Sequence, residues 1–538
     1  MKNIFVTATP PTPNGGLHLG HLAGPYLGAD VFSRFQKMQG HKVTYLTYGD
    51  ANQSFVVTTA KRKNLTPQEL IKRNNVSIVS TMLKADIEID GYKYVLDNKH
   101  HSKFVQEFFL DLYEKGIIIE KYYQALHCDD CNQYLFESFI EGLCPFCKKK
   151  SSGNLCENCA RINNPNDLES PICNICKNPA QAKEQKGFFF SFRNLYTILK
   201  DFYESRTTWR PTLIEYCRQL IDKGIPDYPV SYPTNWGIPV PVGGNKDQSI
   251  NVWFEMYPGI IDSIKSSSSY DDSTDEKLMV QFLGFDNCFF NSVLHVASAL
   301  VKDDEQYLVP EHIYTNHFYL LEKSKFSTSK NHVIWAEDFL QDVEADTLRY
   351  YLSLTNPEHN QTNFELQEYF AKSEKLKTSL DEVIESFLTL TYEYNSRFNN
   401  LLSNQEIDYE AIGLLENTKA QLDEFLGFEH FSLRKAAIAI KDYLEGIENY
   451  IAKYKHLSHS QYEIPFKSFV LSIGYLIKGL AYFTKPIMPK TSDEIFALFS
   501  ISTSEEPRWE NVNNELKEGE WLSNNNREKQ VESVFYEN

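Results

Sequence analysis

Hydrophobic and polar positions follow two different periods along the first hundred residues. The short apolar runs "IFVTA" and "HKVTYLTYGD" end in polar turns, and a segment of helical periodicity from about Leu19 to Gln39 lies between them. Further helical patterns follow at Pro67–Leu83 and Lys103–Lys115. A strand, a helix and a second strand in this order predict the start of a doubly wound parallel sheet.

The middle of the chain interrupts this pattern. Residues 125–180 are rich in Asn, Pro and Lys and show weak periodicity, so something other than a hydrophobic core must hold them. Strand-like runs resume at 228–244, 249–256 and 278–286. We therefore expect an insertion that splits the sheet domain into two parts.

From about Glu344 onward, apolar residues recur at i, i+3 or i+4 and i+7, which predicts a bundle of helices. The expected fold class is therefore α/β: a Rossmann-like doubly wound parallel sheet split by an insertion, followed by an all-α helix-bundle domain. The expected divisions are 1–118 for the first half of the sheet domain, 119–225 for the insertion, 226–343 for the second half and 344–538 for the bundle.

The overall composition narrows the class of protein. At 538 residues the chain is too long for one core, so two to four domains are expected. Its formal net charge of −18 argues against a protein that coats nucleic acid electrostatically, but it is compatible with a local basic groove. The start "MKNIFVTATPP" does not resemble a signal peptide, and no apolar run approaches the length of a membrane span. We expect a cytoplasmic protein without a membrane partner.

Eight of the ten cysteines form four C-x-x-C pairs, namely Cys128/Cys131, Cys144/Cys147, Cys156/Cys159 and Cys173/Cys176. This spacing favours two tetrahedral Cys₄ zinc sites over an iron–sulfur cluster or unrelated surface thiols. Four thiolates leave no open coordination position, so the zinc is expected to fold the insertion and not to catalyse a reaction. Cys217 and Cys288 lie outside the pattern and are expected to be ordinary buried thiols.

Two histidines lie where the first strand passes into the following helix, within "NGGLHLGHLAGPYLGAD" (residues 14–30). A helix N-terminus presents unpaired backbone N–H groups and stabilises anions, phosphates above all. His18 and His21 could donate hydrogen bonds to a polyphosphate there, or they could simply cap the helix. Their spacing alone leaves both interpretations open.

The segment "GLHLGH" (16–21) resembles the HIGH signature of class I aminoacyl-tRNA synthetases, and the flanking "TATPPTPNG" and "ADVFSRFQKMQGHKV" resemble methionyl-tRNA synthetases. The later segments "VSYPTNWGIPVP", "VWFE", "FLGFDNCFF", "EADTLRYYL" and "KPIMPKTSDEI" occur in that family's order. The resemblance implies ATP-dependent formation of an aminoacyl-adenylate, assisted by Mg²⁺, and transfer of the aminoacyl group to tRNA. It also implies a stem-contact region and an anticodon-binding bundle within residues 344–538.

The second class I signature, KMSKS, corresponds to "KFSTSK" at 325–330, where Thr328 replaces the family's second lysine. A mobile loop of this kind closes over the pyrophosphate leaving group. By resemblance, the catalytic residues are His18, His21, Lys325, Ser327 and Ser329. The ATP-binding residues implied in the same way are Thr9, Asn14, Gly16, Gly20, Gly284, Asp286 and Lys330.

The resemblance assigns the amino-acid site to Pro10, Thr12, Asp50, Trp253, Asn287 and Asn291. Asp50 would bind the α-ammonium group and Trp253 would form an aromatic wall. Asn287 and Asn291 stand where the family has an isoleucine and a histidine, and amides unpaired against a thioether are unfavourable. A polar or differently shaped amino acid is therefore expected in place of methionine.

Related synthetases also suggest how the cysteines group: Cys144, Cys147, Cys156 and Cys159 in an inner site, and Cys128, Cys131, Cys173 and Cys176 in an outer one. The family's proline–tryptophan pair, whose indole stacks on an anticodon base, is missing from "ENYIAKYKHLSHS" (448–460). Recognition of tRNA is therefore predicted to differ. The alternative is a ligase that transfers an activated amino acid to a non-tRNA acceptor.

Overall fold

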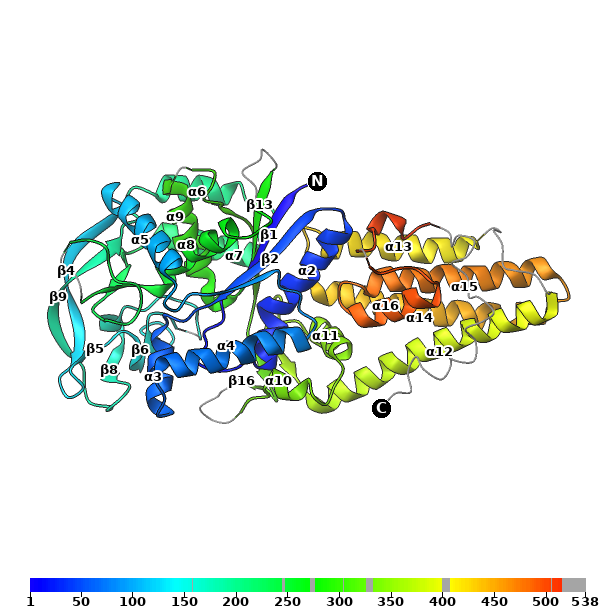
Figure 1. Cartoon of the computed structure of the whole chain (residues 1–538), viewed down its shortest axis with the longest axis horizontal. Helices are drawn as coiled ribbons and strands as arrows, with labels where there is room; N and C mark the ends of the chain where they lie inside the picture. The colour runs from blue at the N-terminus through cyan, green and yellow to red at the C-terminus, as the bar shows by residue number, and fades with distance from the viewer. Residues whose placement is uncertain are drawn as a thin grey trace.

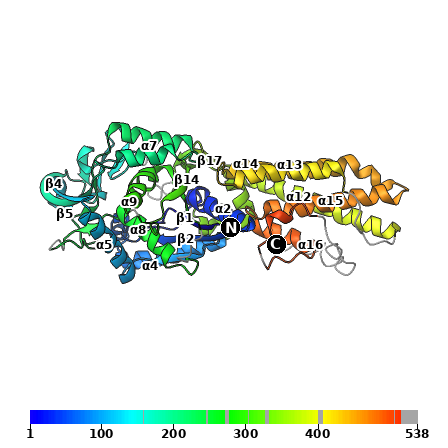
Figure 2. The ribbon, with the colours of Figure 1, turned by 90° about the horizontal axis from the view of Figure 1, so that it is seen from above.

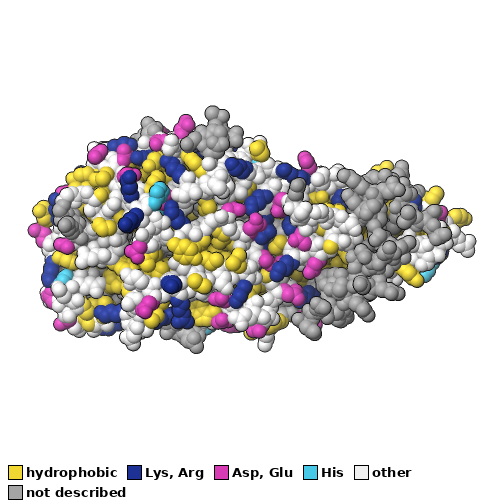
Figure 3. Space-filling view, viewed as in Figure 1, with side chains coloured by type: hydrophobic (Ala, Val, Ile, Leu, Met, Phe, Trp, Pro, Cys, Tyr) yellow, Lys and Arg dark blue, Asp and Glu magenta, His cyan; other side chains and the backbone are white. Residues whose placement is uncertain are grey.

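The computed structural model describes residues 1–156, 158–243, 247–270, 276–302, 304–325, 332–398, 407–504 and 506–514. The molecule is elongated, with the sheet domain and the insertion at one end and the C-terminal helices at the other (Figures 1 and 2). On the face drawn in Figure 3, Lys and Arg side chains are interspersed with Asp and Glu among the described residues. The described part of this face therefore presents no large area of charge of one sign.

A five-stranded parallel sheet in the order β14-β13-β1-β2-β3 forms the centre of the first domain. Its strands are β1 (Asn3–Ala8), β2 (Lys42–Gly49), β3 (Gly91–Tyr94), β13 (Lys277–Gly284) and β14 (Pro310–Asn316). Ile4 and Val6 pack into the core on one face of the sheet, whereas Phe5 packs into the core on the other. Both faces are covered, as the predicted doubly wound fold requires.

Helices from distant parts of the sequence cover the two faces. The helices packed around the sheet are α2 (Leu27–Met38), α4 (Pro67–Lys84), α5 (Lys99–Glu114), α8 (Val252–Lys265) and α9 (His295–Lys302). α2 and α4 share a core with Ile4, while α5, α8 and α9 share a core with Phe5. Strands β2 and β13 flank β1 and are reached by different crossovers, so a crevice is expected beyond the carboxyl ends of β1 and β13.

The helix predicted from Leu19 to Gln39 is present but is not a single straight helix. It comprises α1 (Leu19–His21), the π-helical turn η1 (Leu22–Tyr26) and α2. Pro25 lacks a backbone N–H, and Gly24 has non-helical torsions of φ −80° and ψ −120°. The kink separates the histidine-bearing first turn from the long buried part of the helix.

The insertion is built on a long antiparallel ribbon of β4 (Ile118–Cys128) and β9 (Gln181–Phe190), with Ile118 opposite Phe190 and His127 opposite Gln181. Its smaller elements are β5 (Gln133–Tyr134), β6 (Glu137–Leu143), β7 (Lys150–Gly153), β8 (Glu169–Cys173), α6 (Tyr196–Glu204) and α7 (Pro211–Lys223). The cysteine pairs lie at the turns between these short strands, and the outer group borders a small hydrophobic cluster that includes Leu126, Phe136 and Phe139.

The strand predicted at 249–256 is wrong beyond its first two residues. Strand β12 covers only Ser249–Ile250, and α8 begins at Val252. The Asn251 side chain caps this helix by accepting a hydrogen bond from the Trp253 backbone N–H at 3.0 Å. The apolar run that follows is buried almost all round, so it carries no period that separates a helix from a strand. In the described part of the segment 228–244, residues 228–243, the strands are the two-residue β10 (Tyr228–Pro229) and β11 (Ser231–Tyr232), with an isolated bridge from Pro239 to Ser249.

The predicted bundle is present. Its helices are α11 (Ala345–Leu354), α12 (Leu366–Phe398), α13 (Tyr409–Leu426), α14 (Leu433–Tyr454), α15 (Glu463–Thr484) and α16 (Pro489–Leu498). Among the described residues, α15 alone is long and apolar enough to cross a membrane, but 78% of its most apolar window is buried. The apolar length of α15 is thus what a central helix of a packed bundle needs.

A buried arginine joins the bundle to the sheet domain. Arg349 of α11 is 2% exposed, and its Nη2 donates to Asp30 Oδ2 of α2 at 2.6 Å. Its remaining hydrogen bonds go to backbone carbonyls: Ala85 (3.1 Å) and Asp86 (2.9 Å) after α4, and Pro486 (3.0 Å) and Ile487 (2.7 Å) before α16. The segments "EADTLRYYL" and "KPIMPKTSDEI" therefore meet at this joint.

Candidate functional site

The loop that follows β1 is fixed above the carboxyl ends of two neighbouring strands. The Thr9 backbone N–H donates to the Phe282 carbonyl of β13 at 3.0 Å, and the Asp50 backbone N–H donates to the Pro11 carbonyl at 2.9 Å. The Asn74 side chain of α4 donates to the Pro13 carbonyl at 2.9 Å. Three separate elements thus position the loop that carries Pro10, Thr12 and Asn14, all predicted site residues.

His18 and His21 lie against each other at the start of α1. Their rings stack with centroids 3.7 Å apart, and the His18 backbone N–H donates to His21 Nδ1 at 3.2 Å. A neutral imidazole that accepts at Nδ1 carries its proton on Nε2, so we assign the Nε2–H tautomer to His21. His21 therefore contributes to the cap and still presents a hydrogen-bond donor.

Both imidazoles are neutral at neutral pH. Burial, followed by the proximity of His21, lowers the pKa of His18 well below 6.5. Part of the His21 ring is open to solvent, yet the protein around it desolvates the charged form and lowers its pKa to about 4. Any interaction with phosphate would therefore come from hydrogen bonds directed at its oxygens, not from two imidazolium charges.

The histidine turn is bonded to the chain that follows the predicted closing loop. The Leu19 N–H donates to the Ile334 carbonyl at 3.2 Å, and the Ala336 N–H donates to the Leu17 carbonyl at 2.9 Å. Lys325 ends the short strand β16 (Ser324–Lys325). The rest of the loop, including the predicted Ser327, Ser329 and Lys330, lies outside the described residues. The two predicted class I signatures thus belong to segments that flank one site.

The predicted nucleotide-binding residues after β13 form a compact turn. A Cβ atom added to Gly284 would lie 2.6 Å from Asp286 Oδ1, so only glycine leaves room for this carboxylate. Asn287 Nδ2 donates to Asp286 Oδ1 at 3.1 Å. The structure therefore places Asn287 beside the predicted nucleotide contact Asp286. Gly16 and Gly20 lie in the histidine turn that follows β1, the strand paired with β13.

Asp50 is buried at the end of β2 without a cationic side chain bonded to it among the described residues. It is 1% exposed, and its Oδ1 has no hydrogen-bond partner. Desolvation, and then the nearby carboxyl of Glu255, raise the pKa of Asp50 well above its usual value of 3.8. A buried carboxyl of this kind is unfavourable unless a cation or a donor binds to it.

The predicted aromatic wall is formed by a stacked pair. The ring centroids of Trp253 and Phe290 are 4.0 Å apart, and His295 Nε2 lies 3.1 Å from the Trp253 carbonyl oxygen. Beside them, Asn291 Nδ2 donates to Gln281 Oε1 at 3.3 Å. Four buried polar atoms here have no partner: Trp253 Nε1, Asn291 Oδ1, Gln281 Nε2 and His295 Nδ1. The wall is aromatic but bears polar groups suited to a ligand that forms hydrogen bonds.

Two further buried carboxylates lie near this site, and sequence reasoning missed both. Glu255 of α8 is bonded to His101 Nε2 at 2.9 Å and accepts from Asn52 at 2.9 and 3.0 Å. Glu137 begins β6 in the insertion and is 2% exposed. No local motif marks either residue, because both come close to Asp50 only through tertiary structure. Glu255 and His101 form a paired network, whereas Glu137 forms no ion pair in the described chain.

Glu137 should make stability depend on pH in a defined direction. Burial raises its pKa from 4.5 to about 7, so the folded protein binds more protons than the unfolded chain between these values. Its ionisation should therefore lower stability as pH rises from about 4.5 to above 7, by about 3 kcal/mol in total.

Thermal unfolding of wild type and Glu137→Gln between pH 5 and 8 measures this contribution as a difference. Histidines with lowered pKa values, such as His295, act in the opposite direction but are common to both proteins. The variant should gain stability relative to wild type as the pH rises, and a constant difference would contradict the assignment.

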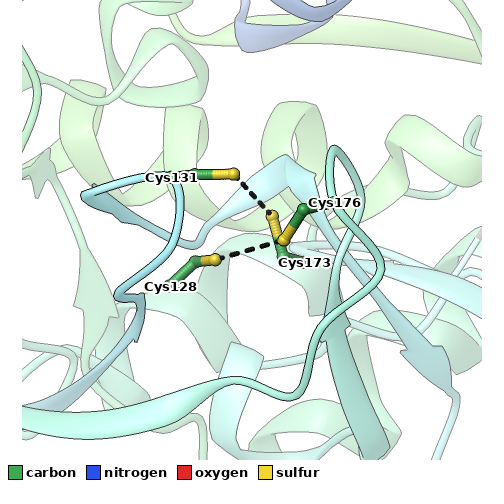
Figure 4. Close-up of side chains that lie close together, drawn as sticks. All are labelled: Cys128, Cys131, Cys173 and Cys176. Carbon is green, nitrogen blue, oxygen red and sulfur yellow. Dashed lines mark hydrogen bonds between the residues drawn. The ribbon is translucent and has the colours of Figure 1, made fainter.

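The eight paired cysteines gather into the two groups that the resemblance implied. The sulfur atoms of the outer group, Cys128, Cys131, Cys173 and Cys176, lie within 4.8 Å of one another (Figure 4). Those of the inner group, Cys144, Cys147, Cys156 and Cys159, lie equally close. In the outer group, Cys128 Sγ lies 3.4 Å from Cys176 Sγ, and Cys131 Sγ lies 3.9 Å from Cys173 Sγ. Thiolates about 2.3 Å from a tetrahedral zinc lie about 3.8 Å apart, so both groups fit this ion.

Each cysteine pair is followed directly by a residue in the left-handed region. These residues are Asn132 (φ 46°), Lys148 (φ 58°), Ala160 (φ 54°) and Lys177 (φ 65°). This conformation costs about 1 kcal/mol or more for a residue with a side chain. The hydrophobic core of the insertion is small, so we expect the free energy of metal binding to keep these four turns in their unfavourable conformation.

Metal analysis of the purified protein should find two zinc ions per chain. Chelation should lower the melting temperature and expose the insertion to proteolysis, because metal binding supplies folding free energy. Cys144→Ser should lose one ion, whereas the matched substitution Cys217→Ser, of a buried thiol outside both groups, should keep two. Iron in place of zinc, or full occupancy in Cys144→Ser, would refute the site.

Comparison with known proteins gives a consistent result. A sequence model of the family described as "tRNA synthetases class I (M)" matches residues 4–385. The methionine–tRNA ligase of Methanobrevibacter smithii is 28% identical over 551 residues, covering 96% of this chain and 78% of its own length. The corresponding ligase of Bacillus mycoides is 27% identical, and the match covers 94% of this chain and 94% of the ligase.

The fold also matches a solved structure, that of Mycobacterium tuberculosis methionyl-tRNA synthetase in complex with methionyl-adenylate. The TM-score is 0.78 at 18% identity, with 97% of this chain and 98% of the other covered. This likeness confirms the predicted arrangement of a split sheet domain, a cysteine-bearing insertion and a helical C-terminal domain.

Proposed function

Since the chain belongs to the class I (M) tRNA synthetase family, whose members are ATP-dependent ligases, we propose that it activates an amino acid as its adenylate and transfers the aminoacyl group to tRNA. The relatives carry the name methionine–tRNA ligase, and none of those compared uses a different kind of acceptor. The polar wall around Asn291 favours an amino acid other than methionine.

One observation carries this proposal: the buried Asp50 and the neutral pair His18/His21 lie on loops that meet above adjacent strand ends. Asp50 would bind the α-ammonium group, because a desolvated carboxylate gains most from a cation. An amino acid held in this way directs its carboxylate toward the histidine turn. Proximity of this kind accounts for a large part of the rate in two-substrate reactions.

The first half-reaction would then proceed by in-line displacement. A carboxylate oxygen of the amino acid attacks the α-phosphorus of ATP, and the bond from that phosphorus to the pyrophosphate oxygen breaks. Donors on His18 and His21 stabilise the negative charge that grows on the phosphoryl oxygens. Lys325, with Ser327, Ser329 and Lys330, would hold the departing pyrophosphate.

Other groups support this chemistry without taking part in it. Thr9, Asn14, Gly16, Gly20, Gly284 and Asp286 are proposed to contact ATP. Mg²⁺ bound to the polyphosphate would neutralise part of its charge. Zinc in the two cysteine groups would hold the insertion, including β6 and its Glu137, against the sheet domain.

Asp50→Asn should weaken binding of the amino acid and at the same time stabilise the folded protein. The variant should raise the KM for the amino acid by about 30-fold or more, because it removes a buried ionic contact of about 2 kcal/mol or more. It should also raise the melting temperature, because the amide removes a desolvated carboxyl whose Oδ1 has no hydrogen-bond partner and which no described cation balances in the free enzyme. Steady-state kinetics and calorimetry check both effects. A variant with an unchanged KM would show that Asp50 does not bind the ammonium group.

The acceptor is tested by incubating the enzyme with ATP, radiolabelled amino acid and bulk tRNA. The proposed function predicts label that precipitates with tRNA and is released by mild base, as an ester requires. Periodate-oxidised tRNA is the control, since it lacks the 3′-terminal diol. Adenylate formation without label on intact tRNA would contradict transfer to tRNA.

A further inference from the structure

Glu137 is a residue of the insertion that reaches into the sheet domain. It lies at the start of β6, where its backbone has a left-handed φ of 44°. Ser54, at the first turn of α3 (Ser54–Arg62), lies close enough for its backbone N–H and hydroxyl to lower the pKa of the Glu137 carboxyl in part, and Ser54 Oγ accepts a hydrogen bond from the Ser138 backbone N–H at 3.2 Å. A strained backbone and a helix terminus thus fix the position of this carboxyl beside the loop that carries Asp50.

One oxygen of the Glu137 carboxyl lacks a hydrogen-bond partner in this position. Its Oε1 is buried and has no hydrogen-bond partner. The indole of Trp253 lies close enough to lower the Glu137 pKa in part, yet Trp253 Nε1 also lacks a partner within hydrogen-bond distance. A buried acceptor and a buried donor therefore face the same region without bonding to each other, and Trp253 is the aromatic wall of the proposed amino-acid site.

Two other buried carboxylates of this region have cationic partners, whereas Glu137 has none among the described residues. Glu255 and Asp262 share His101, whose ring nitrogens lie 2.9 Å and 3.4 Å from them, and Lys93 pairs with Asp262. These two carboxylates are therefore balanced by two cationic partners, since interaction with both acids raises the pKa of His101 to about 9.

Asp50 and Glu137 remain without an ion-pair partner among the described residues. The α-ammonium group of an amino acid can pair with only one of them. The other needs a second cation to be buried as a carboxylate at low cost.

We propose that Glu137 is a specificity-determining residue, and that the amino acid activated at this site has a side chain ending in a cation, an ammonium or a guanidinium group. The inference rests on the proposed function, because it assumes that Asp50 binds the α-ammonium group of the same substrate. The side chain would lie along the Trp253–Phe290 wall. Its terminal N–H groups would donate to Glu137 Oε1 and to the unpaired Asn291 Oδ1.

Direct binding measures the preference without requiring turnover. L-lysine, L-ornithine, L-arginine, L-methionine and L-glutamine are titrated separately into the full-length enzyme without ATP, and binding is followed by the change in intrinsic tryptophan fluorescence, to which Trp253 contributes. We expect one of the three cationic amino acids to bind at least tenfold more tightly than methionine and glutamine. Tighter binding of methionine or of glutamine would overturn the proposal.

Two matched variants assign the preference to Glu137. Glu137→Gln keeps the shape of the side chain and should weaken binding of the preferred cationic amino acid at least tenfold, with the KM for ATP unchanged. Glu141→Gln is the control, since Glu141 lies on the same strand but pairs with Lys150 and Lys177 of the insertion. An unchanged preference in Glu137→Gln would overturn the assignment.

The outcomes for this inference and for the proposed function differ. Methionine-dependent ATP–pyrophosphate exchange by the wild-type enzyme, without exchange with any cationic amino acid, would uphold adenylate formation and overturn the inference alone. Failure of every amino acid to bind or to support exchange would overturn both. The wild-type measurements decide the question even if Glu137→Gln does not fold.

Discussion

Replacing His21 by alanine is expected to slow amino-acid-dependent ATP–pyrophosphate exchange by about 100- to 1,000-fold, the usual effect of losing one donor that stabilises charge in a transition state. The ring is neutral and partly open to solvent, so its removal should leave the melting temperature within about 2 °C of wild type. Exchange kinetics at saturating substrates and thermal unfolding measure the two effects.

The tautomer of His21 makes this prediction more specific. Nδ1 accepts from the His18 backbone, so the catalytic donor is Nε2–H, at the position that a glutamine amide nitrogen can approach. His21→Gln should therefore recover part of the lost rate. His41→Ala, a histidine at the far end of α2, is the control and should be fully active. Equal rates in wild type and His21→Ala would remove this histidine from the mechanism.

Replacing Arg349 by methionine is expected to have the largest effect on stability, a loss of about 3–5 kcal/mol. The substitution would leave Asp30 with Arg34 as its only close cation among the described residues. Four backbone carbonyls would lose the Arg349 donor, and of these the Asp86 carbonyl would keep its bond from Arg34 Nη2. Because the side chain joins α2, the end of α4 and the segment before α16, we expect the sheet domain and the bundle to unfold less cooperatively.

Differential scanning calorimetry tests this expectation. Wild type should show a transition in which the sheet domain and the bundle melt together, and Arg349→Met should split or lower it. Arg349→Lys, which keeps the charge but not the planar set of donors, should be intermediate. Arg34→Met is the matched control, since it removes the other cation of Asp30. The Arg34 side chain donates to Asp30 and to the Asp86 carbonyl, which both belong to the sheet domain, so it does not join that domain to the bundle. A melting profile of Arg349→Met identical to wild type would show that this network does not couple the domains.

The fold could be predicted from the sequence wherever local patterns were distinct. The short apolar run of β1 ends in a polar turn, and the amphipathic bundle helices have a clear period. The C-x-x-C spacing predicted two four-cysteine sites, and the resemblance implied which pairs share each site. The strand predicted at 249–256 was wrong because a helix buried on all sides lacks an amphipathic period, although Asn251 before the apolar run was an available cap signal.

The site was predictable only where its residues lie in contiguous motifs. Asp50 directly follows β2, and His18 and His21 lie where the loop after β1 enters the next helix, so topology places all three at one edge of the sheet. Glu137 and Glu255 come from the insertion and from α8, and no local rule connects either with Asp50. Their role depends on which buried atoms lack partners, and this is a property of the packed structure alone.

Formation of an aminoacyl-adenylate by this enzyme is measured by ATP–pyrophosphate exchange. The assay should be run with each of the twenty amino acids and with ornithine, using wild type and His21→Ala in parallel. We expect exchange that requires one amino acid, with a cationic one the most effective, and that falls at least 100-fold in the variant. Exchange with no amino acid, or exchange indifferent to His21, would contradict the account.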